Sequence, residues 1–485
     1  MQKGASTTTT SAASSQDGPA PRLPTEVCGR IIDHLSAGLD LNYLTLAGNP
    51  DLLALPSCAL VCRDWYFHTW YHLRRRVHLR DRNDVLSLSR TLRERPRLRG
   101  VVQHVVISGQ TSAERSVIQH LAMFAVMLAG RLPKLSVITI RDAEWTVGSM
   151  RMEDVGYLAT FDLVHALNFF NVNVPSIAHL ARLISALPGL RDMNCYDVEC
   201  SQKQPVSPVS PPLNSAHLET LVVLGVAPAI QDLFVRISQA SRLRALELGV
   251  DDSEGLTLPS GGSRSQTLLD ASAASVEVLT LSMFLGSSVD SDKVDSTVER
   301  HLSLSRHESL RRLVIILYYP FNAWSWIPHI VSRIPSKHLI AISVLFWFRA
   351  DHAADDLDGL VTMMEEDGIL VRLDDILQAE CFADIAPGGI CLGFDNGKDW
   401  TPPEKLFGTE SSFRERCNRW DELIRRKMPR CNGRGILITV YGFEERDNWN
   451  RNMGEIHEAR KQQQAKTGVE VQQEDDTEHA PDTSG

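Results

Sequence analysis

The segment LPTEVCGRIIDHL (residues 23–35), followed after a spacer by LPSCALVCRDWYFHTWYHLRRRVHL (residues 55–79), carries the most specific pattern in the chain. Its first part predicts a short helix. Pro24 suits a first helical position, where its missing N–H would have no partner, and Glu26 places a negative charge at the positive helix end. The helix carries an apolar stripe at spacing four, formed by Val27, Ile31 and Leu35.

The second part, from about residue 56 to residue 73, predicts one continuous helix that is apolar on two faces. One face holds Cys58, Val61, Cys62 and Trp65. The other face holds Leu60, Phe67 and Trp70. A surface helix needs only one apolar face. The pattern therefore predicts a helix that lies between its own domain and either another part of this chain or a separate protein.

In this order, Leu23-Pro24-x-Glu26, the apolar helix and Leu60-Val61-Cys62-Arg63-x-Trp65 resemble the F-box. The connection between the two halves is longer than the compact family pattern. The resemblance implies a three-helix domain that docks on the adaptor subunit of an SCF-type cullin–RING ubiquitin ligase, and through it on a cullin. By the same resemblance, the adaptor-binding residues are Leu23, Pro24, Val27, Ile31, Leu60, Val61, Cys62 and Trp65. An ordinary helical subdomain is the alternative.

From about residue 96 a unit recurs in which a helical stretch and a turn precede Leu-x-x-Leu-x-Leu or its apolar equivalent, at intervals of 25 to 34 residues. The nine copies are Val102/Val105/Ile107, Leu135/Ile138/Ile140, Val164/Leu167/Phe169, Leu190/Met193/Cys195, Leu218/Leu221/Val223, Leu243/Leu246/Leu248, Val276/Leu279/Leu281, Leu310/Leu313/Ile315 and Leu339/Ile342/Val344. A strand followed by a helix at this period resembles the leucine-rich repeat, whose units stack into a solenoid.

The usual Asn or Cys of that repeat, eight residues after the first Leu, is absent from all nine copies. The expected fold class is therefore α/β, with a small three-helix F-box-like domain followed by an irregular leucine-rich-repeat-like solenoid. An ordinary α/β domain remains open. The expected organisation is a disordered tail at 1–20, the F-box-like domain at 21–80, the solenoid at 81–443 with loop insertions near 200–216 and 251–266, and a disordered polar tail at 444–485. A last strand is expected in GRGILITVYGF (residues 433–443).

Composition excludes several classes of partner. The net charge of -10 argues against nucleic acid, and the ten arginines between residues 74 and 99 predict a solvated basic helix face. The longest apolar runs, 121–129 and 339–348, are too short to span a membrane. Nine cysteines without a CxxC pair, and no Asn-x-Ser/Thr acceptor, favour the cytoplasm or nucleus.

No stretch predicts an enzyme, a cofactor or a metal site. The set Cys58, Cys62, His68 and His72 would spread over about 21 Å on a continuous helix, too far for one tetrahedral ion. We therefore expect a substrate-recognition subunit that binds an unknown protein through its repeats. The alternative is a leucine-rich-repeat scaffold for protein interactions with no ligase role.

Overall fold

A computed structural model of the chain describes residues 24–41, 50–109, 115–151, 153–202, 215–251, 263–284, 298, 302–318, 324–348, 353–395 and 409–478. The chain divides into two compact units, Met1–Leu73 and Arg74–Gly485. The division falls a few residues before the boundary expected near residue 80. The tail expected at residues 1–20 lies outside the described residues, as do most of the two expected loop insertions.

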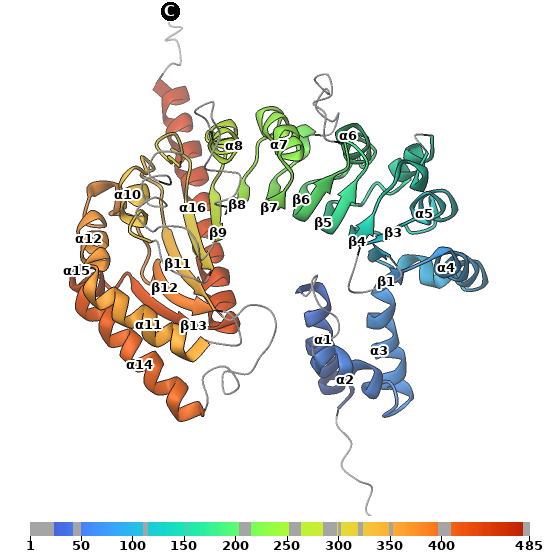
Figure 1. Ribbon diagram of the computed structural model, residues 1–485, viewed down its shortest axis with the longest axis horizontal. Helices are drawn as coiled ribbons and strands as arrows, with labels where there is room; N and C mark the ends of the chain where they lie inside the picture. Colours follow the sequence, from blue (N-terminus) through green and yellow to red (C-terminus); the bar gives the residue numbers. More distant parts are fainter. Residues whose placement is uncertain are drawn as a thin grey trace, which may run out of the picture. The chain divides into compact units, whose positions relative to one another are not determined.

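The first unit contains three helices, α1 (Thr25–Leu41), α2 (Pro50–Cys58) and α3 (Arg63–Arg75), drawn in blue in Figure 1. Its core is small. Ile32 of α1 and Leu55 of α2 are fully buried, and three partly buried apolar side chains pack against them, namely Leu35, Trp65 and Leu73.

The prediction of one continuous helix from about residue 56 to residue 73 is wrong, because the chain turns over residues 59–62. The N–H groups of Leu60 and Val61 bond to carbonyls three residues back, at distances of 3.0 and 3.2 Å, which is a tighter turn than an α-helix. The break lets Trp65 pack on the core while Leu60 and Val61 face solvent. Each of the two predicted apolar faces is therefore divided between the turn and α3 rather than lying along one helix.

The second unit is built on an open sheet in which all thirteen strands found among the described residues are paired in parallel. Apart from β3, which pairs only with β4, the strands lie side by side in sequence order. They are β1 (Arg76–Leu79), β2 (His104–Ser108), β3 (Ser116–Val117), β4 (Val137–Glu144), β5 (Ala166–Val174), β6 (Asp192–Cys200), β7 (Thr220–Val226), β8 (Ala245–Asp251), β9 (Val278–Phe284), β10 (Arg312–Tyr318), β11 (Ala341–Trp347), β12 (Ile390–Asp395) and β13 (Leu437–Tyr441).

The second and third residues of the nine apolar triplets lie in β2 and in β4 to β11, and the first residue of each lies two positions before its strand. The last predicted strand is β13. None of the residues in the triplets is more than 3 % exposed. The middle residues are in register from strand to strand, as in the pairs Ile138↔Leu167 and Leu279↔Leu313. Each copy therefore buries its apolar side chains against the next, which is the packing of a leucine-rich-repeat-like α/β solenoid.

Helices cover one face of this sheet (Figure 1). The helices on this face are α4 (Arg82–Glu94), α5 (Leu121–Leu128), α6 (Ile177–Ser185), α7 (Pro228–Ala240), α8 (Arg264–Ser272), α10 (Ile327–Ser332), α11 (Ala353–Glu366), α12 (Ile369–Ile376), α14 (Glu410–Lys427) and α15 (Pro429–Gly433). The predicted basic face of α4 is paired with a buried side formed by Val85, Leu88, Ser89 and Leu92.

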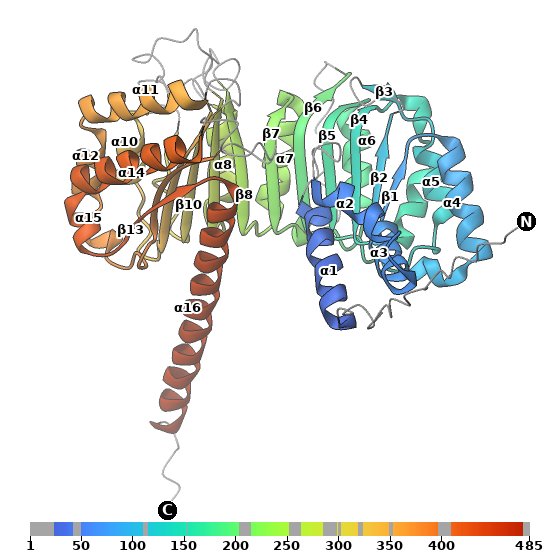
Figure 2. The ribbon, with the colours of Figure 1, turned by 90° about the horizontal axis from the view of Figure 1, so that it is seen from below.

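The opposite face, which we call the inner face, is covered in part by α16 (Phe443–Glu478), whose far end extends past the strands (Figure 2). The prediction of a disordered tail at 444–485 is therefore corrected for residues 444–478, which are helical, while residues 479–485 lie outside the described residues. Trp449 and Met453 of α16 are buried against inner-face residues of the last strands, such as Leu345 and Val440. The charged composition of the segment conceals this apolar stripe, which has one residue per helical turn.

A row of residues with left-handed φ angles crosses four adjacent strands. Asp142, Asn171 and Asp197 have φ angles of 48°, 53° and 53°, and Gly225 has 62°. They occupy equivalent places in β4 to β7, between residues that are paired in register. Asn171 Nδ2 donates to Asp142 Oδ1 at 3.1 Å. The residue one position before the missing Asn or Cys is thus left-handed in four adjacent strands, and a side-chain hydrogen bond joins the first two of these residues.

Candidate protein-docking surface

The start of α1 places two apolar residues on the surface. The carbonyl of Pro24 accepts from the N–H groups of Val27 and Cys28, at 3.0 and 3.1 Å, so the helix begins immediately after the proline. Val27 and Ile31 lie one turn apart, and both are exposed, whereas Ile32 beside them is buried in the core. One side of α1 therefore forms the core and another side presents aliphatic surface.

The turn between α2 and α3 exposes more. Leu60 is 87 % exposed and Val61 is 63 % exposed, and Cys62 is also at the surface. A leucine this exposed has almost no packing within its own chain to stabilise its position. Such residues are common at surfaces that another protein covers.

Aromatic side chains of α3 extend the exposed apolar set. Tyr66, Phe67 and Tyr71 are exposed, and the rings of Tyr66 and Phe67 meet edge to face with centroids 5.6 Å apart. None of these three is among the predicted adaptor-binding residues, although the sequence pattern placed Phe67 on an apolar face of the helix. Exposed aromatic residues contribute much of the binding energy of protein interfaces.

The exposed apolar residues are concentrated in the first unit. Sixteen large apolar or aromatic side chains are exposed among the described residues, and seven of them lie between residues 27 and 71. The other nine are spread over the much longer second unit. We call the seven the apolar set, and its members are Val27, Ile31, Leu60, Val61, Tyr66, Phe67 and Tyr71.

The predicted adaptor-binding residues therefore fall into three groups. Pro24, Val27, Ile31, Leu60, Val61 and Cys62 are exposed. Trp65 is half-buried and packs on the core of the first unit, so it supports the surface rather than forming it. Leu23 lies outside the described residues.

The second unit has a polar hollow of about 1100 Å³, bordered by the turns that precede β5 to β10 and by α16. Its lining includes His165, Arg191, Glu219, Arg244, Glu277 and Lys461. Most of these charges are paired, as in Arg191 with Glu219 at 3.4 Å and Lys461 with Glu277 at 3.5 Å. The hollow can receive a polar segment, but no nucleophile with an activating base is evident among its described lining residues.

Glu277 is the centre of the charges at this hollow. Burial alone would raise the pKa of Glu277, but the neighbouring Arg244, Lys461 and His457 lower that pKa overall. His457 Nε2 lies 3.1 Å from Glu277 Oε2, and burial lowers the pKa of His457. Glu277 therefore remains ionised and fastens α16 to the start of β9.

Among the described residues, no helix is both long and apolar enough to cross a membrane.

No protein-family profile matches the sequence, and a search of curated proteins finds no match. Several solved structures are similar to parts of the chain, among them two that each share 12 % sequence identity with it. The first is the leucine-rich repeat-containing protein LegL7 from Legionella pneumophila, with a TM-score of 0.35, covering 73 % of this chain and 98 % of that chain.

The second is the complex of Rad7 and Elc1 in yeast, with a TM-score of 0.30, covering 80 % of this chain and 90 % of that chain. The class of the protein is defined by its own geometry. It is an α/β protein in which a three-helix unit precedes a leucine-rich-repeat-like solenoid of parallel strands.

Proposed function

We propose that this chain is the substrate-recognition subunit of an SCF-type cullin–RING ubiquitin ligase. The first unit docks on the adaptor, and the second unit binds a protein substrate. The observation that carries the proposal is the exposure of the apolar set on a three-helix unit whose sequence resembles the F-box. A free surface of this composition is stabilised when a partner covers it.

Such a subunit performs no bond chemistry. Its contribution is to hold a lysine of the substrate near the ubiquitin-carrying component of the ligase. Tethering turns an encounter between separate molecules into an effectively intramolecular one, which raises the effective concentration of the two reacting groups. The proposal therefore needs a binding surface at each end of the chain and no active site within it.

The second unit supplies polar surface for a substrate. The inner face of β4 to β8 lies outside the apolar cluster that α16 forms with the last strands. It presents side chains such as Asn194, Tyr196 and Glu247, which alternate with the buried triplet residues. This alternation supports a substrate that is recognised by hydrogen bonds and charge rather than by a deep apolar pocket.

The test is direct binding of the purified full-length chain to the purified SCF adaptor. The variant carries Leu60→Ala and Val61→Ala. The control is Val147→Ala in the second unit, because Val147 is 67 % exposed and Val61 is 63 % exposed. Two truncations at an interface cost about 2 to 4 kcal/mol together, so the double variant raises Kd about thirtyfold or more.

Circular dichroism confirms that the variants are folded, which we expect because Leu60 and Val61 have little packing to lose. Equal affinity of wild type, double variant and control would remove the ligase assignment. If the wild-type chain bound no adaptor, the alternative function would stand, which is a leucine-rich-repeat scaffold for protein interactions with no ligase role.

A further inference from the structure

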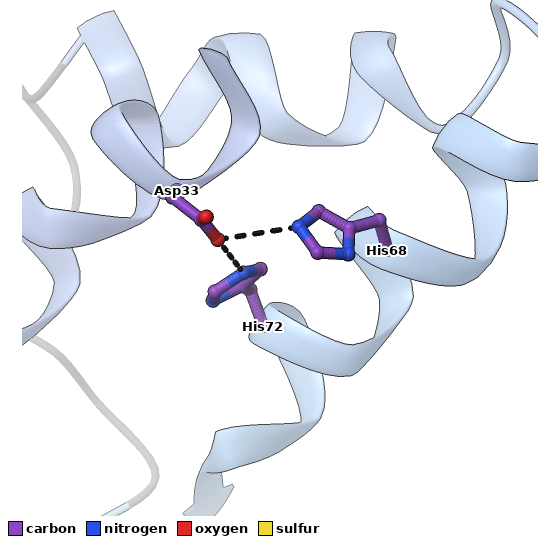
Figure 3. Close-up of side chains that lie close together, drawn as sticks. All are labelled: Asp33, His68 and His72. Carbon is purple, nitrogen blue, oxygen red and sulfur yellow. Dashed lines mark hydrogen bonds and ion pairs between the residues drawn. The ribbon is translucent and has the colours of Figure 1, made fainter. Parts of the chain in front are cut away.

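Three side chains that could hold a metal ion converge in the first unit (Figure 3). His68 and His72 lie one turn apart on α3, and Asp33 projects toward them from α1. Asp33 Oδ1 is 3.2 Å from His68 Nε2 and 2.9 Å from His72 Nε2. Among the described residues, this is the only group of three or more His, Cys, Asp or Glu ligands close enough to share one ion.

The spacing of the ligand atoms suits a tetrahedral ion. Zinc binds imidazole nitrogen and carboxylate oxygen at about 2.0 to 2.2 Å, which places neighbouring ligand atoms roughly 3.3 to 3.5 Å apart. The two distances to Asp33 are close to that range, and all three atoms lie within 4.8 Å of one another. Two histidines four residues apart on a helix are a common zinc-binding pair.

The fourth position is open to solvent. His72 is buried, but the side chains of His68 and Asp33 are 43 % and 56 % exposed. Gly29, one turn before Asp33, has no side chain, and a Cβ there would lie 3.7 Å from His68 Nε2. This leaves space beside the imidazole for a water molecule as the fourth ligand.

A metal link between helices would also stabilise the first unit, whose core is small. Its apolar core cluster contains two fully buried side chains, Ile32 and Leu55, among the described residues. Units with small cores are commonly stabilised by a disulfide or a metal, and every cysteine in the described part of this chain is free. An ion held by Asp33, His68 and His72 would join α1 directly to α3.

We propose that Asp33, His68 and His72 bind a divalent transition metal, for which zinc is the probe, and that the ion fastens α1 to α3. The sequence predicted no metal site, because Cys58, Cys62, His68 and His72 would be too far apart for one ion on a continuous helix. That helix is broken, and the third converging ligand is Asp33. Hydrogen bonds from the two imidazoles to one carboxylate oxygen are the metal-free state of the same cluster.

The first experiment measures zinc binding to the metal-free full-length chain by competition with a chromophoric chelator. We expect one tight site. Asp33→Asn and His68→Gln each raise its Kd on the order of a hundredfold or more, because each removes a direct ligand. The matched control is His34→Ala, because His34 is exposed and adjacent to Asp33 but lies outside the cluster.

The second experiment replaces zinc with cobalt. We expect the absorption bands of a tetrahedral nitrogen and oxygen site, without the thiolate charge-transfer band that Cys58 or Cys62 would give. A wild-type stoichiometry that persists in the His68→Gln/His72→Ala double variant overturns the site, and so does a thiolate band. Both substitutions at Asp33 and His68 change exposed side chains, so a folded protein is expected in each case.

Discussion

The carboxylate of Asp197 on β6 fills the space beside Gly225 on β7 in which any larger side chain would have to lie. Both residues have left-handed φ angles, and they end the row that Asp142 and Asn171 begin. Arg115 fixes the same region, since its Nη1 lies 2.8 Å from Glu199 Oε2 and its Nε donates to Asn171 Oδ1 at 2.7 Å. This row therefore requires glycine at position 225.

Gly225→Ala is expected to lower the free energy of unfolding by about 2 to 4 kcal/mol. The left-handed conformation costs an L-residue about 1 to 2 kcal/mol, and overlap with the Asp197 carboxylate adds a packing cost. Urea unfolding of the second unit measures the loss. In the Asp197→Ala/Gly225→Ala double variant the loss should be smaller than the sum of the two single losses. Strict additivity would contradict the contact.

His307 should make the stability of the second unit fall with acid. The residue is fully buried, and burial lowers its pKa from 6.5 to about 4. The unfolded chain takes up a proton near pH 6.5 and the folded chain does not, so stability is lost as pH falls from about 6.5 toward 4. Between pH 7 and pH 5 the His307 contribution is about 2 kcal/mol. His307→Leu should show a pH dependence smaller by that amount in urea titrations at the two pH values.

Trp449 should anchor α16. Its indole Nε1 donates to the carbonyl of Gly388 at 2.8 Å, its ring is buried, and the Arg312 guanidinium lies 5.8 Å from the ring centroid. Trp449→Ala removes about 3 to 5 kcal/mol of packing. We expect faster hydrogen exchange and tryptic cleavage within α16, where Asn452→Ala, an exposed neighbour, serves as the control. Equal protection of α16 in both variants would contradict the anchor.

Ile31 and Ile32 are adjacent and chemically identical, but Ile31 is 37 % exposed and Ile32 is 1 % exposed. Ile32→Ala should destabilise the first unit by about 2 to 5 kcal/mol. Ile31→Ala should change stability by less than about 1 kcal/mol and weaken adaptor binding. Hydrogen exchange of α1 separates the two effects, and the reverse order of stabilities would contradict the placement of this helix.

The repeat strands could be predicted because their triplets obey a strict rule. Every triplet side chain is buried against the helix-covered side of the sheet. Each copy therefore shows the same pattern, with apolar residues at a first position and then three and five positions later. β1, β3 and β12 were not predicted. β1 lies in an arginine-rich stretch, β3 has only two residues, and β12 contains Gly393, which packs against the backbone of Val440. The left-handed row was missed, although Asp142, Asn171, Asp197 and Gly225 all stand seven residues after the first triplet residue.

The helical tail had a signal as well. Trp449, Met453 and His457 follow one another at spacing four, which marks a helix side even within a charged segment. No sequence signal indicated that Asp33 lies next to His68 and His72. Asp33 is 35 positions from His68 and 39 positions from His72. Their contact depends on how the chain turns between α2 and α3, which the apolar periodicity does not predict.

Because α16 packs back on the last strands, the two ends of the second unit should differ in how cooperatively they unfold. Most contacts of the array join neighbouring copies, which can then open one at a time, and the links from Arg115 to Asn171 and Glu199 reach only as far as β6. His457 instead reaches Glu277 across 180 residues, and Asn450 accepts from Arg312 across 138 residues. These long-range links couple the unfolding of β9 and β10 to that of α16, and they leave fraying to begin among the strands before β9.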